Sequence, residues 1–168
     1  MSEFAFSDND RGELVKMLSA KIGQRTDCKA LEFGWTNCFL GRELRPEFGY
    51  LAASDRFSEC PEQLKADAEK LDLMLIPYEE IGEDCYFGRF HFLYSAFTMH
   101  ECGKHLVDDI LILRRLIIKG GRIVFVDEDA DGFAAYCEKQ LGRCGFLNIS
   151  TEHFEMSGKS CFLISAEK

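Results

Sequence analysis

The sequence lacks any apolar run long enough to cross a membrane, because its most hydrophobic stretch, DILILRRLII, is interrupted by Arg114 and Arg115. Its first residues, MSEFAFSDNDRGEL, are acidic and contain no apolar segment of signal-peptide length. Both absences lead us to expect a cytoplasmic protein with no membrane association. The 168 residues suffice for a hydrophobic core without disulfide or metal support, so we expect a single domain over residues 1–168.

An excess of positive charge is also missing. The 20 Lys and Arg residues against 29 Asp and Glu give a net charge of −9, which argues against general nucleic-acid binding, since that binding depends on neutralising phosphates. The eight cysteines form no CxxC pair, so we expect free thiols. The segment HECGKH places His100 and His105 five positions apart, off a common helical face, and we expect no metal site there.

What the chain does contain is an alternation of helical and strand patterns from end to end. Five predicted strands alternate with helices, namely KALEF, GYLAASD, DLMLIPY, RFHFLYSAF and RIVFVDED. FLNISTEHFEM and KSCFLISAEK, separated by Ser157-Gly158, then predict a hairpin. The expected fold is therefore α/β and doubly wound, with a mostly parallel seven-stranded sheet and a C-terminal antiparallel hairpin. Residues 1–28 would form an N-terminal helix and cover, and residues 29–168 the α/β core.

Two helix boundaries are predicted from local signals. Asp8 or Asp10 would cap the first helix, since Asp is a favoured N-cap residue. Gly120-Gly121 would form the C-cap of the long helix KHLVDDILILRRLII, since glycine adopts the conformation in which helices commonly end.

Acidic and polar residues stand where the predicted strands end. Glu32 and Gly34 close the first strand, and Asp55 closes the second, 21 residues after Gly34. That separation agrees with the spacing of about 20 residues in dinucleotide-binding fingerprints. Glu79 and Ser95 stand at the ends of the third and fourth strands. Since ligands of open parallel sheets bind outside the carboxyl ends of the strands, these residues predict a ligand site there.

The order of elements, and above all the run from FHFLYSAFTMHEC through LRRLIIKGGRIVFVDED to SCFLISAEK, resembles the class I S-adenosylmethionine-dependent methyltransferases. The resemblance extends from about Lys29 to Lys168 and implies a Rossmann-like methyltransferase fold that binds S-adenosylmethionine as cofactor. It also implies a role for each residue at the strand ends: a cofactor loop at Glu32, Gly34 and Thr36, a ribose contact at Asp55, an adenine neighbour at Glu79, and a place under the methionine part at Ser95.

The expected cofactor loop departs from the family pattern, because Thr36 and Cys38 stand where two glycines usually do. A β-branched residue such as Thr disfavours the positive φ that such a loop requires. Two outcomes follow. In the first, the loop takes another path that admits the cofactor, and Thr36 or Asn37 donates hydrogen bonds to the cofactor carboxylate. In the second, the side chains of Trp35, Thr36 and Cys38 fill the pocket.

The leading hypothesis is an S-adenosylmethionine-dependent methyltransferase whose acceptor, a small molecule or a protein, is unknown. The alternative is a non-catalytic binding or regulatory protein of the same fold with a degenerate cofactor loop. His100 follows the fourth strand and is either a base that contacts the acceptor or a plain polar loop residue. Only about the first 25 residues could cover an acceptor. The acceptor site would then be open, completed by a second copy or another protein, or absent.

Overall fold

The computed structural model describes residues 7–22, 25–35, 38–57 and 59–168. Its strands are β1 (Arg25–Phe33), β2 (Phe48–Ser54), β3 (Leu73–Leu75), β4 (Phe90–Ala96), β5 (Ile117–Glu128), β6 (Leu147–Met156) and β7 (Lys159–Glu167). Its helices are α1 (Asp8–Ile22), α2 (Gly41–Leu44), α3 (Glu62–Leu71), α4 (Tyr78–Ile81), α5 (Leu106–Leu116) and α6 (Phe133–Arg143). Short 3-10 turns lie at η1 (Arg45–Glu47), η2 (Asp84–Tyr86), η3 (Met99–His105) and η4 (Ala130–Gly132).

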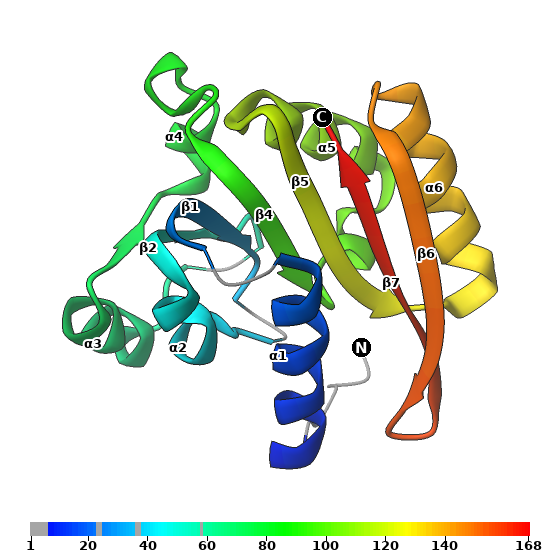
Figure 1. The fold of residues 1–168 in the computed structure, drawn as a ribbon, viewed down its shortest axis with the longest axis horizontal. Helices are drawn as coiled ribbons and strands as arrows, with labels where there is room; N and C mark the ends of the chain where they lie inside the picture. The colour runs from blue at the N-terminus through cyan, green and yellow to red at the C-terminus, as the bar shows by residue number, and fades with distance from the viewer. Residues whose placement is uncertain (1–6, 23–24, 36–37, 58) are drawn as a thin grey trace.

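The strands form one seven-stranded sheet in the order β3-β2-β1-β4-β5-β7-β6. Strands β1 to β5 are parallel, and β7 is antiparallel to both of its neighbours, β5 and β6. The predicted α/β fold with its mostly parallel sheet and closing hairpin is confirmed. Because the chain runs outward from β1 to β3 and then returns to β4, the switch point of the sheet lies between β1 and β4 (Figure 1).

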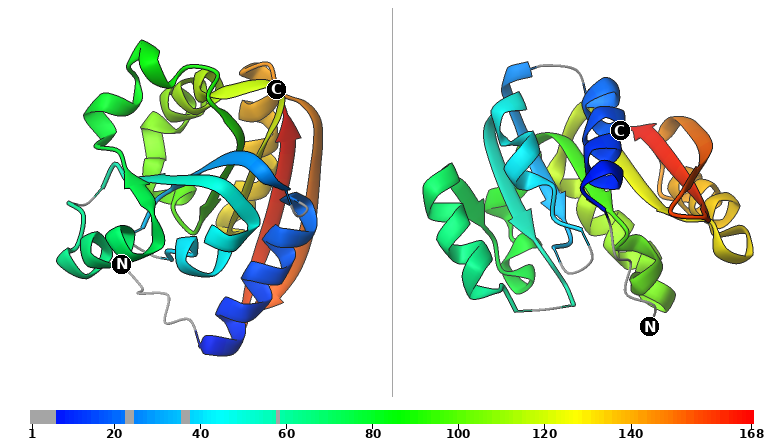
Figure 2. Two further views of the ribbon diagram at one scale, coloured as in Figure 1. Left: turned by 60° about the vertical axis from the view of Figure 1, so that its left-hand side comes forward. Right: turned by 90° about the horizontal axis from the view of Figure 1, so that it is seen from below.

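Helices cover both faces of the sheet. Buried side chains of α1, α2 and α3 pack on one face, and those of α4, α5 and α6 pack on the other. Figure 2, seen from below, separates these layers, with α1 on one side of the C-terminal hairpin and α6 on the other. In the part of the chain that the structure describes, no helix is long and apolar enough to cross a membrane.

The prediction that Gly120-Gly121 caps the long helix is wrong. Helix α5 ends at Leu116, and Ile117 is already extended, with φ −79° and ψ 139°. The two glycines lie inside β5, where the pairing with β4 is interrupted between Ile117 and Arg122. A Cβ at the second glycine would lie 2.8 Å from the His91 carbonyl oxygen, so a close approach of two backbones, and not a helix end, requires glycine there.

The first helix is capped by Ser7, and neither Asp8 nor Asp10 takes that position. The Ser7 hydroxyl accepts a hydrogen bond from the Asp10 amide at 3.1 Å, while the Asp10 carboxylate accepts one from the Ser7 amide at 3.0 Å. This reciprocal pair is a capping box, in which the acidic residue acts from the third helical position. The sequence prediction was wrong by one residue for Asp8 and by three for Asp10, because both aspartates are themselves good caps.

Candidate functional site

The loops that follow the parallel strands begin side by side at the carboxyl edge of the sheet. The Gly34 amide, just after β1, donates to the Ser54 carbonyl at the end of β2 over 2.7 Å. The Phe97 amide, just after β4, donates to the Val126 carbonyl of β5 over 2.8 Å. These bonds extend the strand pairing beyond the strands themselves and bring the residues of neighbouring loops into contact.

A cavity of about 600 Å³ opens at the carboxyl ends of β1, β2 and β3. Its size lies within the range of small-molecule sites. The residues that matter below are Trp35, Asp55, Arg56, Phe57, Tyr78 and Glu79, all of which line it. Cys38 is buried in the core, with 2% of its surface exposed, and burial raises the pKa of its thiol to about 12. The Cys38 side chain therefore packs in the core and is not part of the cavity lining.

Asp55, the residue expected to contact a ribose, lies in the wall of this cavity and is only 4% exposed. Its Oδ2 accepts a hydrogen bond from the Trp35 amide at 2.7 Å, and its Oδ1 accepts one from the Phe57 amide at 2.6 Å. Asp55 thus ties the loop after β1 to the loop after β2.

Glu32, expected in the cofactor loop, lies at the end of β1 and is fully buried beneath that loop. Its Oε1 accepts a hydrogen bond from the Leu40 amide at 2.7 Å, and its Oε2 accepts one from the Tyr94 hydroxyl at 3.0 Å. Burial raises the pKa of Glu32 to about 8, because the charged form loses its hydration. Glu32 therefore holds the two ends of the loop together from below and supports the site without lining the cavity.

Gly34, the one loop glycine that matches the family pattern, has a φ of +100°, which favours glycine. A Cβ built on it would lie 2.1 Å from Thr98 Oγ1, so the loop after β1 packs directly against the loop after β4. Thr98 is fully buried, and Phe97 before it has a φ of +54°, an uncommon conformation for an aromatic residue. Such strain is typical of functional sites.

The remaining expected cofactor residues lie in different environments. Glu79 is exposed at the rim of the cavity, in α4. Ser95 is fully buried inside β4, and its hydroxyl has no hydrogen-bond partner among the described residues. Thr36 and its neighbour Asn37 lie outside the described residues. The structure thus brings Asp55 and Glu79 together at one cavity, whereas Gly34 packs against Thr98 and is not part of the cavity lining.

Arg56, Tyr78 and Asp109 form a cluster next to the cavity that the sequence analysis missed. The Tyr78 hydroxyl donates to Asp109 Oδ1 at 2.6 Å, and the Arg56 guanidinium pairs with the same oxygen. Arg56 also lies over the Tyr78 ring, 5.3 Å from its centroid. Burial, together with the Asp109 contact, raises the pKa of Tyr78, which keeps its hydroxyl neutral. Asp109 of α5 therefore positions two residues that line the cavity.

His100 and Asp127 form a pair on the other side of the switch point. His100 Nδ1 lies 2.7 Å from Asp127 Oδ1, and the His100 amide donates to Asp127 Oδ2 at 3.0 Å. Asp127 is fully buried at the end of β5, whereas the His100 side chain is 45% exposed. The hydrogen bond to Asp127 raises the pKa of His100 above its ordinary value. Asp127 is the first acidic residue near the end of the strand RIVFVDED. An acidic residue near a strand end is also the signal that identified Asp55, so Asp127 could have been found in the same way.

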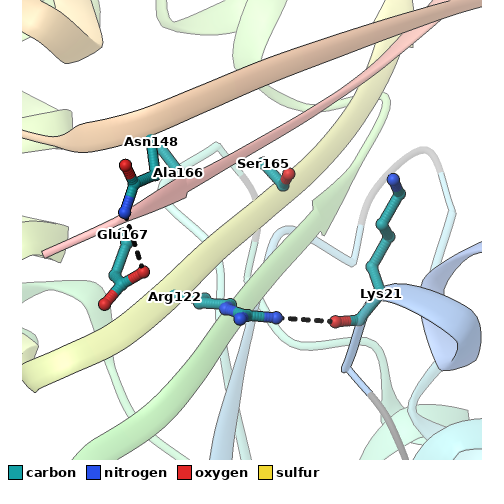
Figure 3. Close-up of a pocket in the computed structure, with 6 residues that line it drawn as sticks. All are labelled: Lys21, Arg122, Asn148, Ser165, Ala166 and Glu167. Atoms are coloured by element: carbon teal, nitrogen blue, oxygen red, sulfur yellow. Dashed lines mark hydrogen bonds between the residues drawn. The ribbon is translucent and has the colours of Figure 1, made fainter.

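A second cavity, of about 230 Å³, lies at the amino ends of the parallel strands (Figure 3). Two of its polar side chains make hydrogen bonds to other residues of the lining. Asn148 donates to Glu167 at 3.2 Å, and Arg122 donates to the Lys21 carbonyl at 3.4 Å. Because ligands of open parallel sheets bind at the opposite, carboxyl edge, we place the candidate site at the larger cavity.

Comparison with known proteins gives matches in structure alone. No protein-family model matches the sequence, and no curated protein matches it. The YcgJ protein of Bacillus subtilis superposes with a TM-score of 0.74 at 10% identity, over 96% of this chain and 99% of its own. A methyltransferase dependent on S-adenosylmethionine from Aquifex aeolicus superposes with a TM-score of 0.72 at 16% identity, over 96% and 98% of the two chains.

A third structure contains both a cofactor product and an acceptor. The 1,6-didemethyltoxoflavin-N1-methyltransferase of Burkholderia thailandensis, with bound 1,6-didemethyltoxoflavin and S-adenosylhomocysteine, superposes with a TM-score of 0.73. The two chains are 15% identical, over 96% of this chain and 79% of that one. The chain has the class I methyltransferase fold. Within this fold the described site contains Asp55 after β2, Gly34 after β1, and the pair of His100 and Asp127.

Proposed function

We propose that this protein binds S-adenosylmethionine at the carboxyl edge of its sheet and transfers the methyl group to a small-molecule acceptor. The observation that carries the proposal is the cavity of about 600 Å³ beside Asp55 and Glu79, on a sheet with the methyltransferase strand order. The acceptors named for two structural neighbours, 1,6-didemethyltoxoflavin and phosphomonomethylethanolamine, are small molecules, which supports the same class here.

The geometry suggests how the cofactor would lie. The cavity lies on the β1 to β3 side of the switch point, where Asp55 forms part of the wall and the Phe57 and Tyr78 rings offer apolar surface to a base. Gly34 and Thr98 are in contact at the switch point itself. A cofactor with its adenosine in the cavity would direct its sulfonium toward the switch point. Holding the acceptor, methyl and sulfur in line would then supply much of the rate enhancement.

A thermal-shift titration with S-adenosylmethionine and S-adenosylhomocysteine tests this proposal. A ligand at about a hundred times its dissociation constant adds roughly 2.7 kcal/mol to the free energy of unfolding. In a domain of this size we expect the melting temperature to rise by about 5–10 °C in a saturable way. A melting temperature that stays constant with both ligands at millimolar concentration would contradict the proposal.

Two cysteine variants provide a matched control for the position of the ligand. Cys60 is half-buried and lines the candidate cavity, whereas Cys85 is exposed and lines a different, smaller cavity. Cys60→Trp should fill part of the candidate cavity and abolish the ligand-induced shift, while Cys85→Trp should leave it intact. Equal shifts in both variants would mean that the ligand binds elsewhere.

A non-catalytic role on the same fold is the second candidate, and one observation favours it. The Asp55 carboxylate already binds two amides of its own loops, and the Thr98 side chain occupies the space next to Gly34. A loop held in this way would serve a binding or regulatory protein as well as an enzyme. A folded protein whose melting temperature does not change with either ligand is the result expected for this second candidate.

A further inference from the structure

We propose that this protein has a second ligand site, separate from the candidate cavity, which binds a planar aromatic carboxylate. The site is the cavity of about 300 Å³ that Cys85 lines, and we call it the Tyr50 cavity. Its lining and the lining of the candidate cavity share no residue. The inference does not depend on the methyltransferase function proposed above, so either can fail without the other.

The Tyr50 cavity lies toward the amino ends of the parallel strands, on the sheet face that α4 and α5 cover. Lys29 of β1 is the pairing partner of Tyr50 in β2, and Tyr50 packs against the cluster on this face. Met74 of β3 lies on the same face, because Leu73 and Leu75 beside it pack on the other and side chains alternate along a strand. Three neighbouring strands thus each supply one side chain to the cavity.

Two cations line the cavity without an acidic partner. Lys29 and Arg89 are exposed, and within the described residues neither forms an ion pair, whereas Lys65, for example, pairs with Glu62 at 2.7 Å. The described lining also contains no carboxylate. In a chain with 29 acidic and 20 basic residues, these two cations form a local positive region that attracts an anion.

Both cations extend from backbone that is held in place. The Lys29 amide donates to His91 Nδ1 at 3.1 Å, and the Arg89 amide donates to the Leu116 carbonyl at 2.9 Å. Lys29 Nζ lies over the Tyr50 ring, 5.9 Å from its centroid. The ammonium group is therefore held beside an aromatic surface, where it would meet an anionic group attached to a bound ring.

The apolar part of the lining is mostly aromatic. The Tyr50 and Phe90 rings lie with their centroids 6.4 Å apart, and the Tyr86 ring and the Met74 thioether also line the cavity. Aromatic rings and thioethers both make favourable contacts with a further ring. A volume of about 300 Å³ is at the lower end of small-molecule sites and suits a ligand of about one or two fused rings.

The Tyr50 hydroxyl adds a hydrogen-bond donor to this lining. It donates to the Met74 sulfur, which is a weak acceptor, so a carboxylate oxygen would accept the same hydrogen more strongly. Burial raises the pKa of Tyr50, so the hydroxyl keeps its proton at neutral pH. The Arg89 guanidinium matches the two oxygens of a carboxylate in geometry. Rings, cations and hydroxyl together fit an aromatic carboxylate.

The test is binding of 2-naphthoate to the full chain, measured by isothermal titration calorimetry. Two controls separate its parts: 2-naphthamide has the rings without the charge, and acetate has the charge without the rings. We expect 2-naphthoate to bind in a saturable way, and at least about tenfold more tightly than either control, since a hydrogen bond to a charged group is worth that much.

Methionine methyl resonances show where the probe binds. The chain has five methionines, of which Met74 lines the cavity and is 41% exposed. We expect 2-naphthoate to shift the Met74 methyl resonance, assigned with Met74→Leu, and to leave those of the buried Met99 and Met156 unchanged.

Paired variants complete the experiment. Lys29→Gln and Arg89→Gln should each weaken 2-naphthoate binding by about tenfold, whereas Lys139→Gln, which removes an exposed charge of α6, should leave it unchanged. Cys85→Trp should abolish binding by filling the Tyr50 cavity, and Cys60→Trp should not affect it. All five positions are exposed or half-buried, so the variants should fold.

Three results would overturn the inference: no saturable binding of 2-naphthoate at millimolar concentration, equal affinity for 2-naphthoate and 2-naphthamide, or binding that is lost in Cys60→Trp and kept in Cys85→Trp. The last result would place the probe in the candidate cavity. None of the three alters the thermal shift expected with S-adenosylmethionine, so a failure of this inference is distinguishable from a failure of the proposed function.

Discussion

Gly34→Ala is expected to destabilise the protein by about 3 kcal/mol or more and to abolish binding of S-adenosylmethionine. The new Cβ would lie 2.1–2.7 Å from the Oγ1, Cγ2 and Cβ atoms of Thr98, closer than any real contact. Overpacking of this kind typically costs 1–3 kcal/mol, and the φ of +100° adds strain for any residue with a side chain. Urea denaturation measures the stability, and a thermal shift measures the binding.

Gly12→Ala is the matched control for this effect. Gly12 lies inside α1, and a Cβ there would meet nothing within 4 Å. Alanine should therefore raise the stability by about 0.5–1 kcal/mol, since glycine is unfavourable within a helix. Thr98→Ala in the Gly34→Ala background should recover part of the loss, because it removes the two nearest atoms. An unchanged urea midpoint for Gly34→Ala would show that the two loops do not pack as described.

Glu32→Gln is expected to make the protein more stable at pH 9 and to flatten its dependence on pH. The pKa of the buried carboxyl is about 8 in place of 4.5. Between these values the folded state keeps a proton that the unfolded state has lost, so stability falls as pH rises through this window. The fall has an upper limit of about 5 kcal/mol, since one pKa unit corresponds to about 1.36 kcal/mol. A glutamine carries no such proton, and its amide can still bond to Leu40 and Tyr94.

The measurement is the free energy of unfolding in urea at pH 5, 7 and 9 for the parent and the variant. Glu13→Gln, at an exposed position of α1, should leave the dependence on pH unchanged. Glu32→Ala should instead be destabilised by about 2–4 kcal/mol at every pH, because the Leu40 amide and the Tyr94 hydroxyl lose their buried acceptor. Parallel pH profiles for the parent and Glu32→Gln would mean that Glu32 is not buried as described.

Taken together, these two positions indicate how the loop after β1 works. Gly34 lets the loop approach Thr98, and Glu32 joins its two ends from below through Leu40 and Tyr94. Neither residue lines the cavity, yet both fix the position of Trp35, which does. Substitutions in the loop after β1 would therefore change both the stability of the protein and its ligand binding. Cys60→Trp, in contrast, should affect ligand binding without acting on this loop.

The site was predicted from the sequence in part. Acidic residues at strand ends led to Asp55 and Glu79, and both of these line the cavity. Their roles in cofactor binding stay predictions. The same pattern did not reveal that Asp55 would bind two backbone amides, or that Glu32 would be enclosed, because both depend on how the loops fold over the sheet. Asp109 gave no signal at all, since an acidic residue within a helix is ordinarily exposed.

The order of helices and strands, the parallel sheet and the closing hairpin all follow from patterns local in the chain, because apolar periodicity and turn residues act over a few positions. The sequence therefore sufficed for the fold, and it predicts the carboxyl edge of the sheet as the place where a ligand would bind. Contacts between residues far apart in the chain required the tertiary structure. The path of each loop depends on the side chains that pack beneath it. Tertiary packing therefore decides three contacts: Thr98 with Gly34, His100 with Asp127, and Arg56 with Asp109.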